Sequence, residues 1–84
     1  MKTVTVRYFA SIREALGTAS ETVATDAPTL AALRRELIAR GGPHAQALAH
    51  GKAVRAAINQ AMSEESAPLP DNAEVAFFPP VTGG

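Results

Sequence analysis

The sequence predicts an α+β fold in which a mixed β-sheet packs on one main helix. Residues 3–10 alternate between polar and apolar side chains, as strands do. Apolar residues in 30–38 recur at the spacing of one helical face, and a second alternating segment, 74–78, ends at two prolines. Since 84 residues suffice for one domain only, we expect a single domain over 1–84 with 79–84 as a protruding tail.

The first predicted strand, residues 3–10, has two different faces. Val4, Val6 and Tyr8 lie on one face, and Phe9 lies on the other. The β-branched and aromatic residues favour a strand with one buried face. We therefore expect the first three side chains to contact the helix.

A short helical connection is predicted after this strand. Ser11 and Glu14 have the spacing of a capping box, in which Ser11 accepts a backbone N–H and Glu14 reaches back to the cap. Gly17 suits the end of such a turn. Residues 21–24 form a second, weaker strand candidate, because the segment is short.

The main helix is predicted to begin at Thr29, which serves as its N-cap, and to end at Gly41-Gly42-Pro43. Arg34 and Arg35 are expected on its exposed side. One apolar stripe should face the sheet, formed by Leu30, Leu33, Leu37 and Ile38.

The second half of the chain contains shorter elements. Residues 44–50 can form a short helix, and alternation over 54–59 predicts a strand. A turn-rich segment, 68–72, leads to the last strand, 74–78. Pro79-Pro80 ends that strand, because proline supplies no ladder N–H.

Alternation also predicts an exposed aromatic pair. If Val75 and Phe77 face the helix, then Phe78 faces away from it, as Phe9 does in the first strand. In parallel neighbouring strands the two rings would form one apolar patch at the base of the tail, which a partner could bind. The alternative is that one ring lies under the loop containing Leu69.

The tail itself suggests acyl chemistry. Residues 79–84, fully extended, would reach about 20 Å. Gly83 and Gly84 add no side-chain bulk, so a terminal carboxylate could enter a narrow channel of another protein and be activated there. The competing interpretation is a frayed end without function.

Composition excludes several other classes of function. Basic and acidic residues are equal in number, eight each, which argues against a nucleic-acid partner or binding to an anionic membrane. The absence of cysteine excludes disulfides and thiol nucleophiles. No apolar run approaches a membrane span or a signal peptide, so we expect a cytoplasmic protein. His44 and His50 lack the further ligands of a metal site, and we predict none.

Several short motifs spread from the first strand to the last residue form a recognisable set. They are Tyr8-Phe9-Ala10, Arg13-Glu14, Gly17, Pro28-Thr29, Asn59-Gln60 and the run from Glu74 through Phe77-Phe78-Pro79-Pro80-Val81-Thr82 to Gly83-Gly84. In these residues the sequence resembles a known family, the small sulfur-carrier subunits of molybdopterin synthase. The resemblance implies a ubiquitin-like β-grasp fold with the first and last strands parallel and central.

The resemblance implies a carrier and not an enzyme acting alone. An ATP-dependent activating enzyme would adenylate Gly84, and a sulfurtransferase system would convert it to a thiocarboxylate. The large synthase subunit, in a heterotetramer of two small and two large subunits, would then receive the sulfur for a pterin precursor. No cofactor would be bound by this chain. The family's partner-facing positions match Phe9, Met62 and Phe78, followed by the tail residues Pro79, Pro80, Val81, Thr82 and Gly83.

Three alternatives remain open on sequence grounds. A thiamine-pathway sulfur carrier shares the fold and the Gly-Gly end, although the longer helix region and the run 77–80 argue against it. A protein modifier, attached through Gly84 to lysines of target proteins, would use the same activation chemistry. A small interaction domain with an idle tail is the purely structural alternative.

Overall fold

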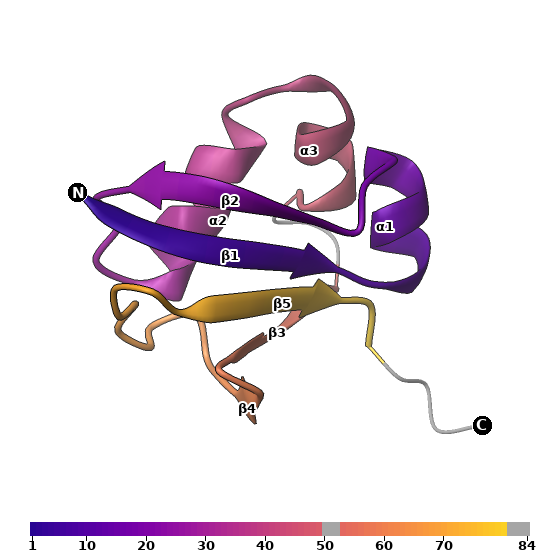
Figure 1. Ribbon diagram of the computed structural model, residues 1–84. Coiled ribbons are helices and arrows are strands. Elements are labelled where there is room, and N and C mark those ends of the chain that lie inside the picture. Colours follow the sequence, from indigo (N-terminus) through magenta and orange to yellow (C-terminus); the bar gives the residue numbers. More distant parts are fainter. Residues whose placement is uncertain (50–52, 81–84) are drawn as a thin grey trace.

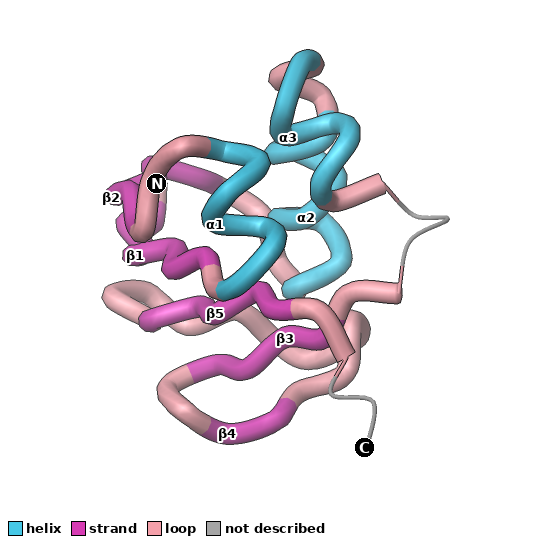
Figure 2. The backbone as a smooth tube through the Cα atoms, turned by 90° about the vertical axis from the view of Figure 1, so that its right-hand side faces the viewer, coloured by secondary structure: helices cyan, strands magenta, loops and turns pink. Residues whose placement is uncertain are grey.

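The computed structural model describes residues 1–49 and 53–80, which form a five-stranded mixed sheet and three helices. Figures 1 and 2 show the helices gathered on one side of the sheet. The predicted α+β class is therefore confirmed. The elements in chain order are β1 (Lys2–Tyr8), α1 (Ala10–Leu16), β2 (Ser20–Thr25), α2 (Leu30–Ile38), α3 (Gly42–Ala47), β3 (Arg55–Ile58), β4 (Ala61–Met62) and β5 (Glu74–Phe78).

The first and last strands lie side by side, as expected. The strand order is β2-β1-β5-β3-β4, and β1 pairs with β5 in parallel, with Tyr8 opposite Phe77. The other neighbouring strands are antiparallel. Both ends of the chain therefore enter one sheet, and the carboxyl ends of β1 and β5 meet at the same edge (Figure 1).

Strand β4 was not anticipated from the sequence. It has two residues, and a two-residue turn at Asn59 and Gln60 returns the chain beside β3. Both turn residues have positive φ, 51° and 70°, which matches the twist of a tight hairpin. A strand this short carries no alternation that could predict it.

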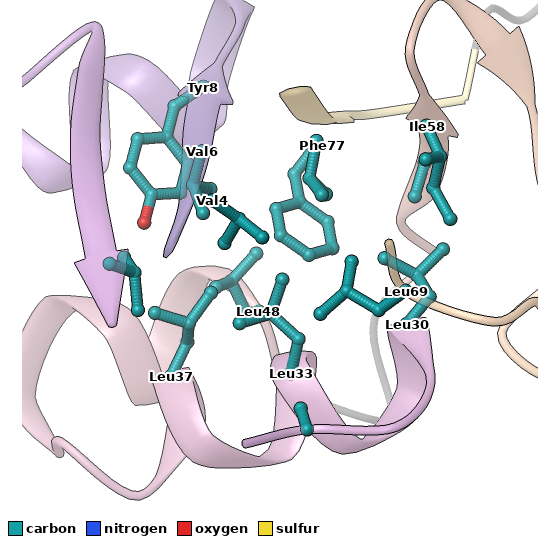
Figure 3. Packing of buried hydrophobic residues seen from close by; sticks show 14 of the residues in the cluster. Val4, Val6, Tyr8, Leu30, Leu33, Leu37, Leu48, Ile58, Leu69 and Phe77 are labelled. Atoms are coloured by element: carbon teal, nitrogen blue, oxygen red, sulfur yellow. The ribbon is translucent and has the colours of Figure 1, made fainter. Parts of the chain in front are cut away.

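The core fills the space between α2 and the sheet, as Figure 3 shows. Leu30, Leu33 and Leu37 form the predicted stripe on α2 and are fully buried. The rings of Tyr8 and Phe77 stack with centroids 6.5 Å apart. The strand residues packed in this core include Val4, Val6, Tyr8, Val23, Ala56, Ile58, Val75 and Phe77, so the predicted inward faces of the first and last strands are confirmed.

The helix ends partly follow the prediction. Thr29 caps α2, its hydroxyl accepting from the Ala32 N–H at 3.2 Å, and Gly17 ends α1 in the left-handed conformation. The helix α2 ends at Ile38, before the glycines, and α3 begins at Gly42 because Pro43 fits the first turn of a helix.

The predicted capping box at Ser11 is wrong. The helix α1 begins at Ala10, one residue before Ser11, and its N-cap residue, Phe9, makes no side-chain cap hydrogen bond. Ala10 has φ 52°, so the backbone turns directly after Phe9 and enters the helix earlier than the box requires.

The expectation for Arg34 is also wrong. The residue is 5% exposed, and its guanidinium donates to the carbonyls of Leu48 and Ala49 and pairs with Glu65. This buried charge is satisfied by the carbonyls at the end of α3 and by the carboxylate. Helical spacing could not predict these partners because they lie on distant segments. Arg35 is exposed, as expected.

A polar cluster around Glu21 joins the sheet to the helices. Its carboxylate accepts from the Tyr8 hydroxyl at 2.7 Å and from Arg40 at 2.6 Å, and lies 2.9 Å from His44 Nε2. Partial burial raises the pKa of Glu21, but hydrogen bonds from His44, Arg40 and Tyr8 and the charge of Arg40 outweigh it and lower the pKa to about 2. Burial and the bond to Glu21 raise the pKa of the Tyr8 phenol.

Lys2, at the start of β1, is tied to two loops. Its ammonium donates to the carbonyls of Ala27 at 2.6 Å and Leu69 at 2.8 Å. These bonds connect the segment before α2 to the loop before β5. In the described part of the chain, no helix has the length and apolar character needed to cross a membrane.

The cluster predicts an acid-dependent loss of stability. Since the pKa of Glu21 falls from an ordinary 4.5 to about 2 on folding, the ionised carboxylate stabilises the fold above pH 4.5, and this contribution disappears as pH falls toward 2. We expect Glu21→Gln to lower the free energy of unfolding at pH 7 and to flatten its decline between pH 4.5 and 2. Urea denaturation at several pH values measures both effects.

Glu14→Gln serves as the matched control, because Glu14 is exposed and has no ion pair among residues 1–49 and 53–80. We expect this variant to keep the wild-type pH dependence. An equal decline for Glu21→Gln and the wild type would contradict the role given to the cluster.

Candidate functional site

The face of the sheet turned away from the helices carries an exposed group of large apolar side chains. We call this face the open face, and we define the apolar patch as Phe9, Met62 and Phe78. Phe9 is 41% exposed and Met62 is 56% exposed, whereas Phe78 is half-buried. Two small residues, Ala57 and Ala76, pair between β3 and β5 on the same face, and Met62 lies opposite Ala57.

The parallel pairing of β1 and β5 places the two aromatic residues together. Tyr8 lies opposite Phe77, and the Phe9 N–H donates to the Phe77 carbonyl at 3.1 Å, so the ladder continues one residue beyond β1. Phe9 and Phe78 are the next residues in this register. The turn at Ala10 then leads the chain away toward the helices and leaves the Phe9 ring on the open face.

The sequence prediction for these rings agrees with the structure in direction. Neither Phe9 nor Phe78 belongs to the core cluster, whereas Leu69 is buried within it. The alternative position, under the loop containing Leu69, is therefore not the one observed. Phe78 is less exposed than the prediction implies, because it is half-buried whereas Phe9 is exposed.

Two arginines share the open face, and the sequence analysis did not single them out. Arg7 lies with its guanidinium 5.6 Å from the centre of the Phe9 ring and 3.7 Å from the Glu74 carboxylate. Arg55 pairs directly with Phe78 across β3 and β5. The signal was present, because Arg7 has the same strand phase as Phe9, and Arg55 the same phase as Ala57.

The base of the tail lies at the edge where β5 ends. Pro79 and Pro80 are half-buried, and Pro79 borders a hollow of about 120 Å³ between α1 and the segment before β3. Small-molecule sites usually have about 300–1,000 Å³, so this hollow has the size of a side chain and not of a nucleotide. The other predicted tail residues, Val81, Thr82, Gly83 and Gly84, lie outside the described residues.

The titratable groups do not gather near the tail. Within residues 1–49 and 53–80 no group of three or more His, Asp or Glu side chains could hold a metal ion. His44 bonds to Glu21 in the cluster on the helix side, and His50 lies outside the described residues. The described surface at the base of the tail therefore presents an apolar patch and not a cluster of metal-ligating groups.

Comparisons with known proteins agree with this arrangement. The model of the ThiS family matches residues 6–84. The molybdopterin synthase sulfur carrier subunit of Escherichia coli strain K12 is 48% identical over 81 residues, which cover 96% of this chain and 99% of that protein. These matches confirm the resemblance found in the sequence.

Solved structures confirm the β-grasp fold. Small archaeal modifier protein 1 of Haloferax volcanii superposes with a TM-score of 0.78 at 20% identity, covering 96% of this chain and all of that one. One chain from the complex of subunits 1 and 2 of the molybdopterin-converting factor of Helicobacter pylori superposes with a TM-score of 0.65 at 24% identity. The match covers 98% of this chain and 99% of that one.

Truncation of two neighbouring rings tests the assignment of the faces. Phe77→Ala leaves a cavity in the core and should lower the free energy of unfolding by about 3–5 kcal/mol. Phe9→Ala removes a ring that already contacts water, and we expect a loss below about 1 kcal/mol. Chemical denaturation measures both. Similar losses for the two variants would show that the Phe9 ring is part of the core.

Proposed function

Because the chain belongs to the ThiS family, we propose that it is the sulfur carrier of molybdenum cofactor biosynthesis, the small subunit of a molybdopterin synthase. The name of the Escherichia coli relative, at 48% identity over nearly the whole chain, favours this branch of the family over a thiamine-pathway carrier. The observation that carries the proposal is the meeting of the apolar patch and the base of the tail at one edge of the sheet.

In this proposal the chemistry takes place at the Gly84 carboxyl group. A carboxylate oxygen attacks the α-phosphate of ATP in an activating enzyme, and pyrophosphate leaves. A hydrosulfide anion supplied by a sulfurtransferase system then attacks the acyl carbon, the bond to AMP breaks, AMP leaves, and a thiocarboxylate is formed. ATP is bound by the activating enzyme and not by this chain, which supplies only the reacting carboxyl group.

The two glycines make this chemistry accessible to partners. Gly83 and Gly84 have no side chains, so the acyl group can pass through a channel too narrow for larger residues. Pro79 and Pro80 restrict the backbone at the base of the tail, which lowers the entropy lost on insertion. The tail from Pro79 to Gly84 thus inserts into the partner, while the folded domain positions it.

The partner that accepts the sulfur is, in this proposal, the large synthase subunit. The apolar patch would dock on it while the tail delivers sulfur to a pterin precursor in that subunit's pocket. The complex of subunits 1 and 2 in Helicobacter pylori supports such a pairing. We propose an assembly of two small and two large subunits, in which this chain alone has no catalytic activity.

A protein modifier is the second candidate, favoured by the similarity to an archaeal modifier protein. A modifier would form an isopeptide bond from Gly84 to a lysine of a target and would not return as a free thiocarboxylate. The two functions are therefore distinguished by the product of activation, which is a covalent adduct with another protein for a modifier and a free thiocarboxylate for a sulfur carrier.

Intact mass spectrometry tests the proposed reaction. After incubation with its activating enzyme, ATP and a sulfur donor, we expect the chain to gain the mass difference between one sulfur and one oxygen. A variant with two residues added after Gly84 is the control and should keep its mass, because its new terminus differs from Gly-Gly. Covalent adducts with other proteins in place of the sulfur-bearing species would favour the modifier.

Changes in the patch test the docking step. Phe9→Asp places a charge in the patch, and we expect affinity for the large subunit to fall by about tenfold or more. Stability should change little, because the ring is exposed. Phe78→Asp should weaken binding as well, but with a measurable loss of stability, since that ring is half-buried.

Isothermal titration calorimetry with the large subunit measures the affinities, and thermal unfolding measures the stabilities. Thr22→Asp is a suitable control, because Thr22 is exposed on β2, two strands away from β5. Unchanged affinity for Phe9→Asp would contradict the proposed docking face.

A further inference from the structure

Each aromatic residue of the apolar patch has an arginine beside it on the open face. The guanidinium of Arg7 lies over the Phe9 ring, 5.6 Å from its centre. Arg55 lies opposite Phe78 in the register of β3 and β5. A surface that covers the two rings therefore also covers the Arg7 guanidinium and meets the strand position from which Arg55 extends.

These guanidinium groups have unused hydrogen-bonding capacity. Arg7 approaches the Glu74 carboxylate at 3.7 Å, which is an ion pair too long for a hydrogen bond, and the two side chains are 48% and 38% exposed. Within residues 1–49 and 53–80, the Arg55 side chain forms no ion pair or hydrogen bond. This holds also for Glu64, an acidic residue shortly after β4.

Docking removes water from these groups. A guanidinium has five N–H donors and no acceptor, so an apolar partner surface would leave most of them without partners. Burying a charge without a partner costs more than the contacts with neighbouring rings return. Carboxylates on the partner would accept hydrogen bonds from these N–H donors in a bidentate arrangement. Their negative charge would also attract the arginines before contact.

We propose that the large synthase subunit presents carboxylates opposite Arg7 and Arg55, so that docking on the open face combines apolar contact with two charge-assisted pairs. This inference rests on the proposed function and specifies the chemistry of the partner surface. The whole chain has a formal charge of zero, so the attraction comes from this face and not from net charge.

The decisive variant is Arg55→Leu, which enlarges the apolar patch and removes one charge. If the partner surface carries a carboxylate at this point, the variant leaves that carboxylate unpaired, and affinity should fall by about tenfold or more. If the partner surface is only apolar, the variant should bind as tightly as the wild type or more tightly. Arg35→Leu is the matched control, because Arg35 is exposed on α2, on the helix side of the sheet.

Calorimetry and surface-binding kinetics with the complete large subunit measure the effect at two salt concentrations. We expect the wild type and Arg35→Leu to lose affinity in higher salt, mainly through slower association, and Arg55→Leu to show a weaker salt dependence. Thermal unfolding confirms that each variant is folded, and Arg55→Gln, which keeps a polar side chain, should also bind more weakly.

The outcomes separate the two levels of the proposal. If the wild type binds the large subunit but neither salt nor Arg55→Leu changes the affinity, this inference is overturned and the proposed function stands. If Arg55→Leu weakens binding to the activating enzyme alone, the inference is likewise overturned for the large subunit. Absence of binding by the wild type would overturn the proposed function together with the inference.

Discussion

The parallel pairing of β1 with β5 is the constraint on which the rest of this structure depends. It brings residues that are about seventy positions apart into one ladder, with Tyr8 opposite Phe77, and it places both inward rings in the core under α2. The same register sets Phe9 and Phe78 at one edge of the sheet. The tail leaves from that edge, so one set of backbone hydrogen bonds determines the core, the position of the two exposed rings and the starting point of the tail.

The two faces of the sheet differ in how much they contribute to the core. The helix-side face holds the core and the hydrogen-bonded cluster around Glu21, which joins β1, β2 and the ends of α2 and α3. The open face carries side chains that contribute little to packing, such as Phe9 and Met62. Since strand residues alternate between the faces, residues of the open face can change without replacing a side chain of the core.

Most strands and the main helix could be predicted from the sequence, but several contacts between distant segments could not. Alternation in β1 and β5 and the Thr29 cap were predicted correctly, because these signals depend on local geometry. The burial of Arg34 and the start of α1 were not, because the first depends on carbonyls far along the chain and the second on a left-handed residue at Ala10. The exposed rings were predicted; their neighbouring arginines were visible in the same alternation. The roles of these residues in binding remain predictions.

Under the proposed function, the position of Lys2 makes it a poor acceptor for the activated carboxyl group of a second copy of the chain. The sequence has two lysines, Lys2 and Lys52, and Lys52 lies outside the described residues. The ammonium of Lys2 donates to two carbonyl oxygens, and these contacts occupy the nitrogen that would attack an activated acyl group. Polymers in which one copy is joined to the next through this residue would first have to break both contacts, so the fold itself discourages self-linkage at its amino-terminal strand.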